Sequence, residues 1–180
     1  MKAQPIDQEA LASLHEAAWP WALHLARGDR DFAQDVLSIA YLAILEGKAT
    51  WSGQSAFKTW VFGVIRMTCK SQSRSRSLLS FRFSQATPET LEAIGPSDIP
   101  KDPISQSMKA ALAALPGKQA EILALVFGQD FTVEEAAEIM GVSLGTARTH
   151  YARAKASLRA KLDRPERSSD HDRRRSSSPV

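Results

Sequence analysis

The chain has 180 residues, of which 43% are hydrophobic and 24% charged, and its formal net charge is +3, a balance that excludes a wholly disordered protein. Its one cysteine, Cys69, excludes an intramolecular disulfide and a zinc site built from several cysteines. We find no secretion leader, no apolar run near the roughly 20 residues of a membrane span and no catalytic motif, so we expect a cytoplasmic protein without membrane insertion, enzyme activity, cofactor or metal.

The first part of the chain is predicted to be helical. Between residues 6 and 27 apolar side chains recur at helical spacing, and Pro20 is expected to kink or break the segment, so one helix and two short helices both fit. Residues 31–45 form a second apolar stripe that predicts an amphipathic helix. The loop-like stretch 49–55 follows, and helical periodicity resumes over residues 57–80.

The composition then changes to that of a linker. Residues 85–102 contain three prolines, a glycine and four acidic residues against one lysine. Helical periodicity returns from Met108 onward, whereas the residues after Asp163 have none. The sequence therefore predicts an all-α fold of two small helical domains with a flexible linker and a disordered tail. Their predicted bounds are 5–80 for the first domain, 81–106 for the linker, 107–163 for the second domain and 164–180 for the tail.

A helix-turn-helix motif is the strongest local pattern. Thr132 and Glu135 have the spacing of a capping box, which starts a helix, and Gly141 allows a left-handed turn residue after it. Ser143 is expected to cap the second helix. That helix combines residue types that read base edges with types that bind phosphate, as a helix in the DNA major groove requires. The predicted DNA contacts are Ser143, Thr146, Arg148, Thr149, His150, Arg153 and Lys155.

Basic residues gather in two separate tracts. Residues 66–82 and 144–162 each carry five basic side chains and no acidic one, which favours a polyanion contacted twice, and nucleic acid in particular. A helical hairpin with a solvated basic face is the alternative interpretation.

LPGKQAEIL from Leu115, with TVEEAAEIMGVSLGTAR from Thr132, looks like the −35-binding region four of the extracytoplasmic-function (group 4) sigma factors of the sigma-70 family. GQSAFKTWVFGVIR from Gly53 resembles their region two, which engages the −10 element, and DFAQDV from Asp31 is similar to the start of the helix that docks on the polymerase clamp.

The resemblance implies a sigma factor that binds the clamp and flap of core RNA polymerase, recognises −35 DNA and opens and captures the −10 element. It also implies an anti-sigma partner, and it places the acidic linker in a channel of the polymerase, although a solvated spacer fits equally well. The implied −10 contacts are Trp51, Ser55, Phe57, Trp60, Arg66, Lys70 and Arg74. The implied polymerase contacts are Asp35, Ser38, Ile39 and Leu42.

Some residues allow a second interpretation. Phe57 and Trp60, three residues apart, also suit a core that supports the loop, whereas Trp51, flanked by polar residues, is the better candidate for a base contact. Ser38-Ile39 replaces a polar Gln-Glu pair that the family usually carries, and Met67 replaces a polar residue. The Ser38-Ile39 departure leaves open a helix-turn-helix regulator that is not a polymerase subunit, and Met67 leaves open an unusual −10 preference.

Overall fold

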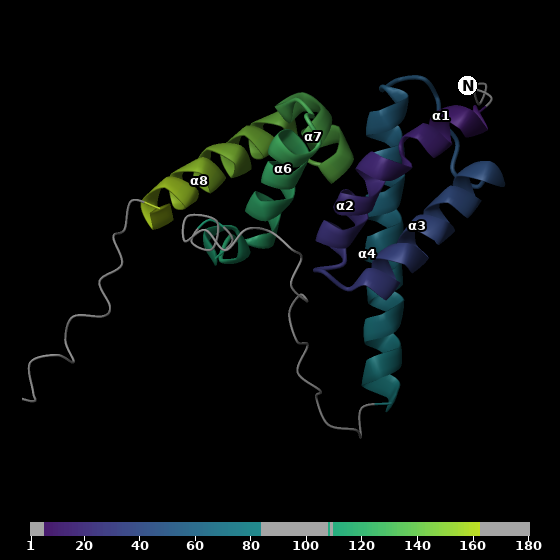
Figure 1. The fold of residues 1–180 in the computed structure, drawn as a ribbon, viewed down its shortest axis with the longest axis horizontal. Helices are drawn as coiled ribbons and strands as arrows, with labels where there is room; N and C mark the ends of the chain where they lie inside the picture. The colour runs from purple at the N-terminus through teal and green to yellow at the C-terminus, as the bar shows by residue number, and fades with distance from the viewer. Residues whose placement is uncertain (1–5, 84–107, 109, 163–180) are drawn as a thin grey trace, which may run out of the picture.

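A computed structural model describes residues 6–83, 108 and 110–162 of the chain (Figure 1). All regular elements among these residues are α-helices, which confirms the predicted fold class. They form an N-terminal and a C-terminal group of helices. The N-terminal group consists of α1 (Gln8–Ser13), α2 (His15–Leu25), α3 (Arg30–Leu45) and α4 (Phe57–Phe83). The C-terminal group consists of α6 (Gly117–Gly128), α7 (Val133–Met140) and α8 (Leu144–Leu162).

The first helical segment forms two helices, one of the two predicted alternatives, but the break between them lies at Leu14 and not at Pro20. The Leu14 amide donates to the carbonyl of Leu11 at 3.2 Å, a tight last turn that ends α1. Pro20 lies inside α2. Proline removes a hydrogen bond to the residue four positions earlier, here Glu16, and both residues are exposed, so water can hydrogen-bond to the carbonyl that has lost its partner.

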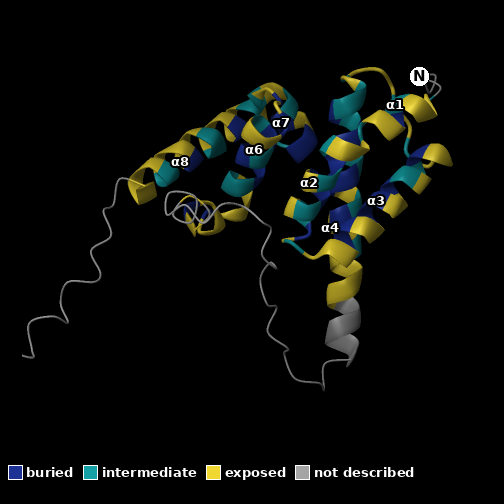
Figure 2. Cartoon of the chain, viewed as in Figure 1, coloured by how far each residue is buried: buried dark blue, intermediate teal, exposed yellow. Residues whose placement is uncertain are grey.

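Trp21 anchors the core of the N-terminal group. Its side chain is 1% exposed, and its indole N–H donates to the carbonyl of Phe62 at 3.2 Å, which joins α2 to α4. The same indole ring stacks on the Phe62 ring at 6.2 Å between centroids. Val36 and Ile44 of α3 are fully buried in the same cluster of core residues, so three helices contribute to one apolar centre (Figure 2).

Local signals start and end α7 as predicted. The Thr132 hydroxyl accepts from the Glu135 amide at 3.1 Å, and the Glu135 carboxylate accepts from the Thr132 amide at 2.9 Å, which completes the capping box. Gly141 ends the helix with φ 62°, a left-handed conformation that glycine adopts without a Cβ penalty.

The two groups of helices share one core rather than standing apart. α7 packs on α4, and α6 packs on α2. The rings of Phe62 and Phe131 meet edge to face at 4.9 Å across this contact. α4 continues through residues 81–83, which the predicted linker had included, and the linker's residues 84–106 and the predicted tail lie outside the described residues. The division into two domains stays a prediction.

Candidate nucleic-acid interface

The helix-turn-helix has the geometry that its sequence predicts. Three small residues, Ala136, Ala137 and Ala147, are at most 4% exposed between α7 and α8, so the two helices can approach closely. The Ser143 hydroxyl accepts from the Thr146 amide at 3.2 Å and caps the start of α8. One end of α8 is thus held rigidly on α7, as a recognition helix requires.

Most of the predicted −35 contacts lie on the outer face of α8. Arg148, Arg153 and Lys155 are exposed, and His150 is half-buried. The hydroxyl of Thr149 donates to the carbonyl of Gly145 at 2.9 Å, and the Ser143 and Thr146 hydroxyls lie 2.8 Å apart. The hydroxyls therefore stabilise the first turns of α8, and its basic side chains lie at the surface.

Arg148 has an acidic neighbour that the sequence analysis did not identify. Its guanidinium donates to the Glu134 carboxylate of α7 at 3.0 Å, and both side chains are exposed. A backbone hydrogen bond at Glu134 itself, and then the hydrogen bond and charge of Arg148, hold the pKa of Glu134 below its usual value. The spacing of fourteen residues across a turn is not a pattern that helical periodicity reveals.

The loop before α4 is closed by aromatic side chains. The indole N–H of Trp51 donates to the carbonyl of Ser55 at 3.0 Å. The rings of Trp51 and Phe57 meet edge to face at 5.2 Å, and those of Phe57 and Trp60 lie 5.8 Å apart. All four residues are half-buried, so they support the loop and also present part of their surface to solvent.

The basic face predicted along α4 does not include Arg66 in this conformation. Arg66 is 2% exposed, and its guanidinium forms an ion pair with Glu121 of α6, which is itself 7% exposed. Lys70 and Arg74, one and two turns later, are exposed. Burial, and then the charges of Arg66 and Lys118, lower the pKa of Lys70. Arg66 departs from the prediction because it pairs with Glu121, which lies 55 positions away in the sequence, a contact that no local pattern indicates.

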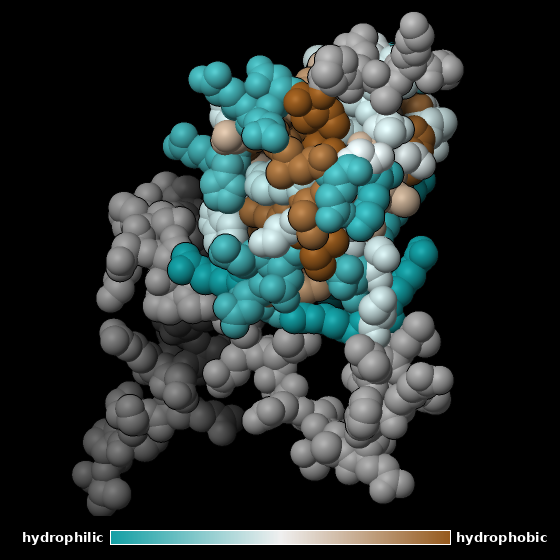
Figure 3. Space-filling model, turned by 90° about the vertical axis from the view of Figure 1, so that its right-hand side faces the viewer, coloured by the Kyte–Doolittle hydropathy of each residue, from teal (hydrophilic) through white to brown (hydrophobic). Residues whose placement is uncertain are grey.

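The predicted polymerase contacts lie on the outer face of α3. Asp35 and Ser38 are exposed, and an Arg76 guanidinium nitrogen lies 3.9 Å from the Asp35 carboxylate. Two large apolar side chains of the same helix are exposed: Ile39 is 39% and Leu42 is 55% exposed. Hydrophobic side chains gather on the face of the molecule where α3 lies (Figure 3). An exposed apolar patch of this kind is typical of a protein-binding surface.

Other possible sites receive no support from the geometry. Among the described residues no three His, Cys, Asp or Glu side chains are grouped to hold a metal ion. Burial, as the largest cause, raises the pKa of the Cys69 thiol, which favours the unreactive protonated form. Across the described helices, none has an apolar stretch long enough to cross a membrane.

Comparisons with known proteins agree with these features. The family described as sigma-70, region 4, matches residues 105–158, which include the helix-turn-helix. The ECF RNA polymerase sigma factor EcfG of Rhodopseudomonas palustris (strain TIE-1) is 28% identical over 135 residues, which are 75% of this chain and 74% of the relative.

Solved structures extend the likeness over both groups of helices. The sigma factor RpoE of Bartonella quintana, in complex with the anti-sigma factor NepR, is 27% identical with a TM-score of 0.68, and the match covers 87% of this chain and 98% of RpoE. CnrH, in complex with the cytosolic domain of CnrY, is 18% identical with a TM-score of 0.57 over 86% of each chain, which supports the fold alone. The region-four motif, the helix-turn-helix geometry and the match across both groups lead to one conclusion: over most of its length the chain is similar to sigma factors of the extracytoplasmic-function group of the sigma-70 family, and it functions in transcription initiation.

Proposed function

We propose that the chain binds core RNA polymerase and directs it to promoters by reading −35 DNA with α8 and capturing the opened −10 element with the loop and helix around Trp51 to Arg74. The observation that carries this proposal is the outer face of α8, where Arg148, Arg153 and Lys155 are exposed on a helix held by a capped turn. The role requires no catalytic chemistry from the chain itself, and we place it in the cytoplasm.

The −35 contact follows from the chemistry of the exposed side chains. Arginine can donate two hydrogen bonds to a guanine edge in the major groove, and each such pair contributes about 1–3 kcal/mol of discrimination. Arg148 stands near the N-terminal end of α8, the part of a recognition helix that contacts base edges. Arg153 and Lys155, farther along, suit the phosphates.

The −10 contact is proposed for the aromatic loop and the basic helix after it. An unstacked base can be held by an aromatic ring, which contributes about 1–3 kcal/mol per base. Trp51, Phe57 and Trp60 each leave part of their surface open for this contact. Lys70 and Arg74 are exposed along α4, where they can hold the backbone of the separated strand.

The polymerase contact is proposed for the outer face of α3. Ile39 stands where the family usually carries a polar residue, and it is 39% exposed next to Leu42. An apolar pair here suits docking by hydrophobic burial, at about 25 cal/mol per Å² of apolar surface covered. Asp35 and Ser38 surround the pair with polar contacts, as is common at the rim of an interface.

Run-off transcription with core RNA polymerase tests the function directly. We expect transcripts from fragments of the host genome only when the chain is present, and about tenfold fewer with Arg148→Ala, in line with the loss of about 1–3 kcal/mol for one base contact. Arg159→Ala is the matched control, because it removes the same charge from an exposed position near the other end of α8. DNA binding without polymerase-dependent transcripts would contradict the proposal.

We also propose that an anti-sigma protein regulates the chain. The similar sigma factor RpoE of Bartonella quintana was crystallised with the anti-sigma factor NepR, and the match to RpoE covers 87% of this chain. Affinity purification of the tagged chain from its native cell should recover a small inhibitor that suppresses the run-off signal. Recovery of the chain with polymerase alone under all growth conditions would count against this partner.

A further inference from the structure

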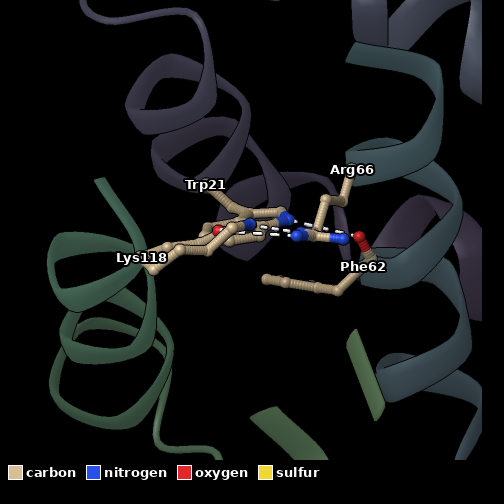
Figure 4. A network of polar contacts seen from close by, with 5 residues as sticks. Trp21, Phe62, Arg66 and Lys118 are labelled. Atoms are coloured by element: carbon tan, nitrogen blue, oxygen red, sulfur yellow. Dashed lines mark hydrogen bonds and ion pairs between the residues drawn. The ribbon is translucent and has the colours of Figure 1, made fainter. Parts of the chain in front are cut away.

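Ion pairs between helices lie both in the interior and on the surface of this protein. Arg66 and Glu121 are almost fully withdrawn from solvent, and Lys118 donates to the same carboxylate (Figure 4). Arg148 of α8 and Glu134 of α7 pair at 3.0 Å, and 65% and 57% of their side chains are exposed. The surface pair therefore has room for a further partner, whereas the interior pair is enclosed by protein.

The surface pair joins the starts of the two helices of the helix-turn-helix. Glu134 lies in the first turn of α7, which the capping box of Thr132 and Glu135 fixes, and Arg148 lies near the start of α8. A backbone hydrogen bond at Glu134, and then the hydrogen bond from Arg148, lower the pKa of this carboxyl, so it is ionised at neutral pH. A carboxylate carried by one helix is thus fixed beside the arginine that we expect the other helix to present to DNA.

The guanidinium of Arg148 has enough donors for a base and for Glu134 together. It carries five N–H groups in one plane. The edge of a guanine uses two of these groups, at O6 and N7. The nitrogen Nη2, which donates to Glu134, carries two N–H groups, so one can stay on the carboxylate while the other, with one from Nη1, faces the guanine. Binding to DNA therefore does not require the pair to break.

A carboxylate in this place favours contact with bases over contact with phosphates. An exposed arginine side chain loses rotamer freedom when it binds, and a partner that already holds it reduces this cost. The negative charge of Glu134 repels the phosphates, so it opposes a shift of Arg148 from the base edge to the backbone. Adenine and cytosine present amino donors in the major groove, which cannot pair with a guanidinium held in place. Selectivity for guanine therefore increases, whereas the total attraction for DNA decreases.

We propose that Glu134 is a positioning residue for the −35 contact: it holds the guanidinium of Arg148 in the orientation that reads a guanine, and it increases base selectivity rather than affinity. The inference rests on the proposed −35 contact of α8. The observation that carries it is the 3.0 Å contact between two exposed side chains on two helices that pack together. Glu134 acts through Arg148 and contacts no base itself.

Promoter selection tests this role, because it measures the preference at each base pair separately. Full-length chains, assembled with core RNA polymerase, would bind a pool made from one host fragment that the wild type transcribes, with the base pairs of its −35 element randomised. Sequencing of the bound fragments gives the preference for each base at each position. The chains to compare are the wild type, Arg148→Ala, Glu134→Ala and the double variant. Glu138→Ala is the matched control, because it removes the same charge from an exposed position one turn later on α7.

Arg148→Ala should lose the guanine preference at one base pair, which identifies the base that Arg148 reads. We expect Glu134→Ala to lower the preference at that same base pair about three- to fivefold, within the range of an ion pair between exposed side chains, and to leave the other base pairs unchanged. Adding Glu134→Ala to Arg148→Ala should change no preference further, because the effect passes through Arg148. Glu138→Ala should match the wild type at every base pair.

Three outcomes would overturn the inference. A folded Glu134→Ala chain with unchanged preferences would show that Glu134 does not position Arg148. A sharper guanine preference would show that Glu134 competes with DNA for Arg148, and a loss spread evenly over all base pairs would indicate a structural role alone. If circular dichroism shows that Glu134→Ala loses helix content, Glu134→Gln decides, since it keeps the shape of the side chain: its preference must fall at the same base pair.

The outcomes also separate the inference from the proposed function. If Arg148→Ala loses its preference and Glu134→Ala does not, only the inference fails. If Arg148→Ala keeps every preference, the −35 contact through this residue is wrong, and the inference fails with it. If the wild type transcribes no host fragment, the proposed function fails as a whole, and so does the inference that rests on it.

Discussion

The edge-to-face contact of Phe62 and Phe131 provides a quantitative test of the shared core. The two rings belong to different groups of helices and lie 4.9 Å apart, and Phe131 is 4% exposed. We propose to replace each phenylalanine by leucine, singly and together. Leucine keeps most of the buried volume, so each single change should cost about 1–2 kcal/mol in free energy of unfolding.

The coupling between the two changes is the informative quantity. An aromatic pair contributes about 0.5–1.5 kcal/mol beyond the area that it buries. The ammonium of Lys58 lies 4.6 Å from the Phe131 ring and 5.8 Å from the Phe62 ring, so it adds a cation–π contribution that either substitution weakens. We therefore expect the double variant to be more stable than the sum of the single effects predicts, by about 1 kcal/mol.

Urea unfolding, followed by both circular dichroism and tryptophan fluorescence, gives the four free energies of the cycle. Coincident transitions would support a single cooperative unit. Phe131→Leu combined with Ile44→Val is the control, because Ile44 lies in α3 beside Ile6 and Ala49, and these effects should add within about 0.5 kcal/mol. Additive effects for the ring pair itself would refute the reasoning, since they would mean that the rings do not meet in solution.

Alanine substitutions at two glycines should change the melting temperature in opposite directions. A Cβ would meet no atom within 4 Å at either position, so only the backbone conformation differs. Gly141→Ala should lower the melting temperature by a few degrees, because its φ of 62° costs an L-residue about 1–2 kcal/mol, and Gly145→Ala should raise it, because alanine favours a helix over glycine by about 0.5–1 kcal/mol. Shifts of the same sign would show that backbone conformation does not decide these positions. A separate prediction concerns pH: burial alone would raise the pKa of Glu121, but Arg66 and Lys118 outweigh it and hold that pKa below the usual value of about 4.3. The stability from this ionised carboxylate is present above pH about 4.3 and is lost as the pH falls through its lower folded pKa, so urea midpoints of the wild type should fall more steeply below this pH than those of Glu121→Gln, and parallel curves would contradict the assignment.

Much of the fold and of the DNA-binding motif could be predicted from the sequence, because these features depend on residues close together in the chain. The capping box of Thr132 and Glu135, the left-handed Gly141 and the Ser143 cap all join groups within a few residues of each other. Helical periodicity also identified the buried face of α7, including Ile139. Pro20, where a kink or a break was expected, does not end the helix, because an exposed proline can remain inside a helix when water satisfies the freed carbonyl.

Only the tertiary structure decided what each helical face packs against. Periodicity shows that a face is apolar, but it does not name the partner, and Arg66 meets Glu121 across 55 positions of sequence. In the sequence, Glu121 stands between Ala120 and Ile122, and a charged residue among apolar ones was the one available signal of a buried ion pair. This signal does not indicate which helix carries the opposite charge. The sequence by itself determined the helices, their caps and the exposed basic face of α8. The closed packing, the burial of Arg66 and the pairing of Arg148 with Glu134 depend on long-range contacts, which the chain acquires only when it folds.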